Sequence, residues 1–250
     1  MQTPWTVTIH ADVTITPPHS FTPRDIPGLQ LWLKADAGVY QDAALTIPAV
    51  LDGAPIGGWI DQGPGGNNVL QASAPAQPAL KVAGINGLPV VHPNGTSDVL
   101  ATAAPIAHGI GTGDFYLAAL IRVGAADNAD RAIWANGVYA PGWYVETARP
   151  ALYFSTTYFD LPTLAAGSVH LLEVWRAAGV LYFGLDGITS TQTYSFVGSI
   201  ANAVNRIFND TDGSDFGDHD LGELVFAAGG GGLANQAALR SYMLGRWGVG

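Results

Sequence analysis

The chain has no cysteine, few charged residues and no long apolar run. Without cysteine, disulfides, thiolate zinc sites and cysteine nucleophiles are excluded across all 250 residues. Ten Lys and Arg against 20 Asp and Glu give a net charge of -10, which disfavours nucleic acid and anionic membrane surfaces as partners. No segment reaches the roughly 18 to 20 apolar residues of a membrane span, and no secretory signal peptide is visible. We therefore expect a protein made in the cytoplasm that binds neither nucleic acid nor membrane.

Glycine and proline, in contrast, are abundant, with 32 and 16 copies spread between short apolar runs. Those runs are rich in aromatic and β-branched residues and are separated by turn dipeptides such as Asn86-Gly87 and Asp186-Gly187. The pattern predicts strands near residues 5–9, 12–16, 30–33, 88–91, 115–121, 143–147, 151–154, 170–175, 180–185, 194–197 and 221–226. Since no helices alternate with them, we predict an all-β fold, a two-sheet antiparallel jelly-roll sandwich.

The last segment is the one predicted helix, over residues 233–247. Its apolar residues fall near one face at helical spacing: Leu233, Ala237, Leu239, Met243, Leu244 and Trp247. Gly229 to Gly232 are predicted to form a flexible connection before it, and Gly248 is a predicted stop. Residues 1–28 carry Pro17, Pro18, Pro23 and Pro27, which predicts an N-terminal arm followed by a sandwich over residues 29–250.

Four segments together resemble the concanavalin A-like lectin/glucanase superfamily, in the LamG-like subset of phage appendage and bacterial surface proteins. They are residues 27–38 (PGLQLWLKADAG), 58–68 (GWIDQGPGGNN), Gln77-Pro78 with 86–91 (NGLPVV), and 221–226 (LGELVF) with 244–248 (LGRWG). The resemblance covers residues 27–248 and implies a concanavalin A-like sandwich. It does not transfer a function, because this architecture hosts enzymes, lectins and passive scaffolds.

Catalytic signatures are weak in this sequence. Retaining glycosidases need two carboxyl groups about 5 to 5.5 Å apart, which alternate residues of one strand supply. The three glutamates, Glu146, Glu173 and Glu223, have no acidic residue two positions away. There is no Gly-x-Ser-x-Gly motif and no His-x-x-x-His pair, so structural or solvent-facing roles are expected for the histidines, which are His10, His19, His92, His108, His170 and His219. We therefore predict that the chain is not an enzyme and requires no cofactor.

Two kinds of binding residue are candidates. Five aspartates lie within residues 210–220, and Asp210, Asp212 and Asp215 are the predicted ligands if this loop holds calcium. The alternative is a solvated acidic hairpin without metal. Trp59, Tyr144 and Tyr158 are candidates for stacking on a sugar ring, with packing in the core as their alternative role.

The N-terminal arm is a candidate attachment device. Trp5, Val7 and Ile9 share one strand face and could anchor the arm on a neighbouring subunit's sheet, or they could form an ordinary edge strand. With the resemblance, this favours a non-enzymatic phage virion structural protein: a head decoration, head fibre or tail appendage that contacts other virion proteins and its own copies. The alternatives are a carbohydrate-binding module for host-surface glycans and a glycan-cleaving enzyme.

Overall fold

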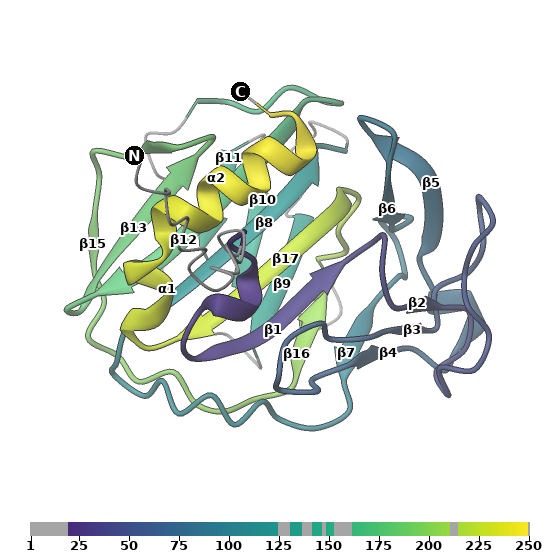
Figure 1. Ribbon diagram of the computed structural model, residues 1–250, viewed down its shortest axis with the longest axis horizontal. Coiled ribbons are helices and arrows are strands. Elements are labelled where there is room, and N and C mark those ends of the chain that lie inside the picture. The colour runs from purple at the N-terminus through teal and green to yellow at the C-terminus, as the bar shows by residue number, and fades with distance from the viewer. Residues whose placement is uncertain are drawn as a thin grey trace, which may run out of the picture.

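In the computed structural model, two antiparallel β-sheets lie face to face, with a helical segment on the outer face of one of them (Figure 1). The structure describes residues 20–124, 131–136, 142–146, 149–152, 162–210 and 215–249. The predicted all-β sandwich with a C-terminal helix is confirmed. No helix of the described part is long and apolar enough to span a membrane.

Each sheet combines strands from distant parts of the chain. Within the described residues, sheet A has nine strands: β1 (Leu29–Lys34), β5 (Ala79–Ile85), β6 (Leu88–His92), β8 (Phe115–Arg122), β12 (Val169–Ala177), β13 (Val180–Leu185), β14 (Ile188–Thr189), β15 (Tyr194–Ser195) and β17 (Asp220–Ala228). Sheet B has eight in the same part of the chain: β2 (Val39–Tyr40), β3 (Gly58–Trp59), β4 (Val69–Leu70), β7 (Leu100–Thr102), β9 (Arg131–Asn136), β10 (Gly142–Glu146), β11 (Arg149–Leu152) and β16 (Asn205–Ile207). Two short 3-10 helices, η1 (Pro23–Asp25) and η2 (Ala74–Ala76), lie in the connections.

Strand β17 shows how the sequence pattern produces two separate cores. Its Leu221, Leu224 and Phe226 enter the core between the sheets, while Val225 and Ala227 enter a second core on the outer face of sheet A. Alternate strand residues point to opposite faces, so both faces of β17 are apolar because both are covered. A register shift between Leu221 and Glu223 keeps each set on its own side.

The outer core is closed by two helical segments, α1 (Gly230–Ala234) and α2 (Gln236–Trp247). Leu239, Met243 and Trp247 of α2 are buried against sheet A, and Gly248 ends the helix in a left-handed conformation with φ of 62°. The predicted helix and its stop are therefore correct, but helical structure begins earlier and is interrupted at Asn235.

The glycines before the helix are not a flexible connection. Gly229 is the N-cap, Gly230 to Gly232 form the first helical turn, and a Cβ on Gly231 would lie 1.9 Å from the carbonyl oxygen of Pro27. A Cβ on Gly232 would lie 2.5 Å from the Cβ of Tyr116. Glycine is required there because the helix backbone approaches its neighbours too closely for a side chain.

The described end of the arm, residues 20–28, lies on the same outer face as α2 (Figure 1). Ile26 is buried there, Phe21 makes an edge contact with Tyr242, and the N–H of Ala228 donates to the carbonyl of Gly28 at 2.9 Å. This part of the arm therefore packs on its own sandwich. The predicted anchors Trp5, Val7 and Ile9 lie outside the described residues.

Candidate functional site

Sheet A divides into two branches along one edge of β17. Strand β1 pairs with β17 over Glu223 to Ala227, and β6 pairs with it at Leu221. The division falls at Gly222, whose carbonyl accepts the N–H of Ala35 at 2.9 Å. From there the chain turns through residues 35–38 and enters sheet B as β2. A fork results between this turn and the β5–β6 hairpin.

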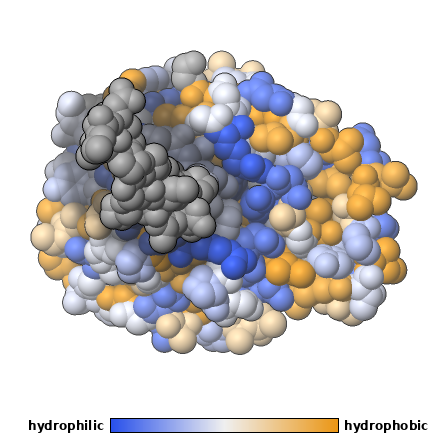
Figure 2. Space-filling model, viewed as in Figure 1, coloured by the Kyte–Doolittle hydropathy of each residue, from blue (hydrophilic) through white to orange (hydrophobic). Residues whose placement is uncertain are grey.

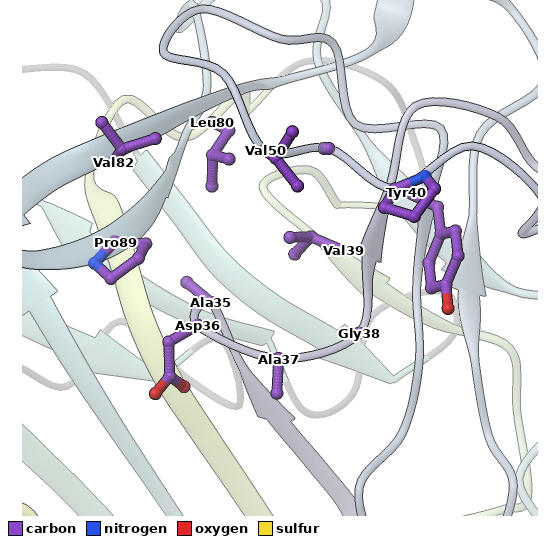
Figure 3. A pocket seen from close by; sticks show the side chains of 12 residues that line it. Ala35, Asp36, Ala37, Gly38, Val39, Tyr40, Val50, Leu80, Val82 and Pro89 are labelled. Atoms are coloured by element: carbon purple, nitrogen blue, oxygen red, sulfur yellow. The ribbon is translucent and has the colours of Figure 1, made fainter.

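The fork contains a pocket of about 430 Å³ (Figure 3). Leu80, Val82 and Pro89 of the hairpin form one wall, and Val50 extends that wall from the loop of residues 41–57. The turn at residues 35–38 forms the opposite wall, followed by Val39 and Tyr40. The volume falls in the range of small-molecule sites, which are mostly apolar with a few placed polar groups.

The rim of the pocket is unusually apolar for a surface. Val50 and Val82, which line the pocket, are 69% and 37% exposed, and Ile47 and Leu51, which adjoin its lining in the loop of residues 41–57, are 53% and 70% exposed. Figure 2 shows hydrophobic residues gathered at this end of the molecule, over the β5–β6 hairpin and the neighbouring loop. Clustered exposed apolar side chains mark a binding surface more often than scattered ones do.

The loop that carries this rim has a defined shape because Asp42 binds its backbone. The Asp42 carboxylate accepts the N–H of Ile47 at 2.8 Å, and the hydroxyl of Thr46 donates to it at 2.7 Å. These hydrogen bonds, that of Ile47 first, lower the pKa of Asp42. The rim is therefore held in place although its side chains are exposed.

Two polar side chains stand at the pocket, Asp36 and Tyr40. The Asp36 carboxylate is ion-paired with Arg246 of α2 and lies 3.5 Å from Nζ of Lys34. The indole N–H of Trp59 donates to the carbonyl of Lys34 at 3.0 Å, which fixes the chain just before the turn. A fixed carboxylate and a phenol beside apolar walls can accept and donate hydrogen bonds while a ring packs on the walls.

Glu173 and Glu223 do not form an accessible catalytic pair, because both are fully buried beneath α2. Glu173 accepts from the Tyr116 hydroxyl and, at 2.8 Å, from Nε of Arg240. Glu223 accepts from the indole groups of Trp32 and Trp247, as described below. Their role in the described structure is to attach the helix to the sheet.

Two of the three predicted sugar-stacking residues, Trp59 and Tyr144, are buried in the structure. Trp59 has no exposed surface and Tyr144 is 6% exposed, so neither ring can stack on a sugar from solvent. Trp59 follows the alternative of core packing between the two sheets, and Tyr144 is buried between its strand neighbours Trp143 and Val145, which both belong to that core. Tyr158 lies outside the described residues. The sequence patterns do not predict the polar pocket residues: Asp36 lies in the segment 27–38, which indicates only an opening strand, and Tyr40 lies outside every predicted strand and motif.

Two aspartates of the acidic segment 210–220 lie beside basic side chains. Asp220 lies 2.6 Å from Nδ1 of His92 and 3.7 Å from Nζ of Lys81, and Asp218 lies 3.9 Å from Nε of Arg131. Three aspartates are the predicted calcium ligands. Asp210 is buried, Asp215 is half-buried, and Asp212 lies outside the described residues. No group of three His, Cys, Asp or Glu suited to a metal occurs within the described residues. Calcium binding stays a prediction.

No protein-family model matches this sequence, and no curated protein matches it either. Solved structures do match the fold. A Trypanosoma rangeli sialidase in complex with sialic acid superposes with a TM-score of 0.55 at 13% identity, over 90% of this chain and 34% of the sialidase. A GH54 arabinofuranosidase complexed with arabinofuranosyl-alpha-1,2-xylobiose gives a TM-score of 0.54 at 11% identity, over 74% of this chain and 50% of the enzyme.

The chain therefore spans about a third to a half of these glycosidases. At such identities the likeness establishes the β-sandwich fold and no activity. The prediction of a non-enzymatic phage virion structural protein is contradicted by these matches, because the matching structures are glycan-cleaving enzymes.

Proposed function

We propose that the chain is a glycan-binding β-sandwich module that serves glycan processing, with the fork pocket as its binding site. The matching structures are glycosidases of which this chain spans only a part, which fits a module within such a system. The pocket carries the proposal.

The pocket suits a sugar because a pyranose or furanose ring has apolar C–H faces and a polar rim. Val50, Leu80 and Val82 offer an apolar wall, and Tyr40 borders the pocket at one end, with its ring on the other side of β2 from Val39 (Figure 3). The Asp36 carboxylate is held by Arg246 and Lys34, so it is already ordered before a sugar hydroxyl binds. Pre-ordering lowers the entropic cost of binding.

A glycan array followed by NMR titration tests the proposal. We expect binding of at least one glycan, with chemical-shift changes centred on Tyr40 and Val82. Tyr40→Ala should weaken that binding by about tenfold, the equivalent of about 1.4 kcal/mol of lost stacking and hydrogen bonding. Tyr194→Ala is the matched control, since Tyr194 is also half-buried but lies on β15 away from the pocket. Equal effects of the two substitutions, or no glycan bound at all, would refute the proposal.

Glycan cleavage is the second candidate function, favoured by the activities named for the matching structures. Incubation with sialosides and arabinofuranosides, followed by measurement of released reducing sugar, separates it from binding alone. Release that Asp36→Asn abolishes would make the pocket a catalytic site. Binding without release would leave the module as a binding site.

A further inference from the structure

Three side chains at the opposite end of sheet A from the pocket form a hydrogen-bonded chain. The Oγ of Ser168 lies 2.8 Å from Nε2 of His170, and Nδ1 of His170 lies 2.7 Å from Oδ2 of Asp186. This is the connectivity in which a carboxylate orients an imidazole and the imidazole deprotonates a hydroxyl. We propose that Ser168, His170 and Asp186 form a hydrolytic triad for short-chain acyl esters.

The fold places these residues together through two neighbouring strands. Ser168 precedes β12 by one residue, and His170 is two residues further on, so their side chains share one side of the strand. Asp186 stands in the Asp186-Gly187 turn after β13, the strand that pairs with β12. The turn is therefore held beside the start of β12.

The acid of the triad is rigidly held. The N–H of Asp186 donates to the carbonyl of Leu171 at 2.9 Å, and Oδ1 of Asp186 accepts the N–H of Leu171 at 2.8 Å. Its φ of 49° belongs to the left-handed region that Asp tolerates in such turns. With Oδ1 occupied by the backbone, Oδ2 is directed at the imidazole and fixes its orientation.

The nucleophile is rigid as well as accessible. The carbonyl of Ser168 accepts the N–H of Val123 at 2.8 Å, and its N–H donates to the carbonyl of Ala165 at 3.0 Å. The three residues before it, 165–167, are exposed, and Ser168 and His170 are half-buried. An ester can therefore reach the Ser168 hydroxyl from solvent without movement of the sandwich.

The chemical step requires only water as co-reactant. Oγ of Ser168 attacks the ester carbonyl while its proton passes to Nε2 of His170, and that proton then leaves with the departing alcohol. Water, deprotonated by His170, cleaves the resulting acyl-serine to release the acid and restore the hydroxyl. The Ser168 hydroxyl donates to the carbonyl oxygen of Ala165 at 2.5 Å, so this hydrogen bond must break before Oγ can pass its proton to His170.

This site is independent of the proposed glycan pocket. In sheet A the pocket adjoins β1, β5 and β6, whereas the triad adjoins β12 and β13 on the other side of β8. No Gly-x-Ser-x-Gly motif marks Ser168 in the sequence, because the serine precedes a strand instead of standing between a strand and a helix. Loss of one site leaves the other testable.

Labelling of the purified full chain with a fluorophosphonate probe tests the triad. We expect a covalent adduct on the peptide that contains Ser168, and hydrolysis of p-nitrophenyl acetate above the buffer rate. Ser168→Ala should abolish the adduct, and His170→Gln should slow its formation by about a hundredfold through loss of the general base. Asp186→Asn keeps a residue that tolerates the turn and should slow labelling at least tenfold.

Ser195→Ala is the matched control, because Ser195 is exposed on β15 and should leave labelling unchanged. Circular dichroism of every variant confirms that the sandwich is intact. An adduct absent from the wild-type chain, or retained in Ser168→Ala, would overturn the proposal. So would ester hydrolysis that is equal in the wild type and in His170→Gln.

Discussion

The buried carboxylate of Glu223 should be the strongest single attachment of the helix to the sandwich. Its Oε1 accepts the indole N–H of Trp32 at 2.7 Å and the hydroxyl of Tyr242 at 3.1 Å. Its Oε2 accepts the indole N–H of Trp247 at 2.9 Å and lies 3.4 Å from Nε of Arg246. One side chain of β17 thus joins β1 to three residues of α2.

We expect Glu223→Leu to lower the free energy of unfolding by about 4 kcal/mol. The substitution fills a similar volume but leaves two buried indole N–H groups without acceptors, at about 1–3 kcal/mol each. It also removes one of the two carboxylates beside Arg246, the other being Asp36, while the loss of one buried charge offsets part of the cost. For a chain of 250 residues this corresponds to a drop in Tm of roughly 10 °C.

Urea denaturation followed by tryptophan fluorescence and far-ultraviolet circular dichroism measures this cost. Glu223→Gln is the matched control, because it keeps the shape and one acceptor oxygen and should cost about half as much. A loss below about 1 kcal/mol in Glu223→Leu would show that the four donors find other acceptors. The attachment would then rest on the apolar face of α2 alone.

Three further predictions concern stability. Burial raises the pKa of Glu223 above its ordinary value of 4.5, so the folded state holds that proton more tightly. The stabilisation that this proton gives is complete below the pKa of Glu223 in the unfolded chain and decreases as pH rises through its pKa in the folded state. The loss of unfolding free energy caused by Glu223→Gln, measured by urea denaturation, should therefore be smaller at pH 7.5 than at pH 4. Gly222→Ala should cost about 2 kcal/mol in the same assay, because its Cβ would lie 2.5 Å from the Trp247 ring; wild-type stability would contradict the contact. Arg176 is fully buried and donates to the carbonyls of Gly111, Gly113 and Gly198. Arg176→Met should therefore lower the free energy of unfolding by about 3 kcal/mol, which calorimetry would detect as a lower Tm, and an unchanged Tm would refute this role.

The candidate site depended on information that local sequence patterns do not carry. The segment 27–38 was recognisable as a strand, yet its Asp36 became a site residue only because Arg246, 210 residues later in the chain, pairs with it. Trp59 illustrates the opposite error. Its exposure could not be decided from alternation alone, since a strand that is covered on one face presents half of its aromatic residues to the core.

The triad shows the same limit for catalytic chemistry. Ser168 and His170 are separated by one residue, but a Ser-x-His sequence is common and carries no meaning by itself. Asp186 completes the arrangement because strand pairing brings the β13–β14 turn back to the start of β12. Register, which is set by many side chains at once, decided that contact.

Alternation, turn dipeptides and the spacing of apolar residues in the last segment determined by themselves that this chain is a β-sandwich closed by a helix, because these patterns express local backbone preference and the need to bury one face. The fork at Gly222, the pocket beside it and the helical use of Gly231 were decided only by the tertiary structure. They arise where segments far apart in sequence compete for the same edge of β17 or approach closely, and such competition is settled by packing in three dimensions.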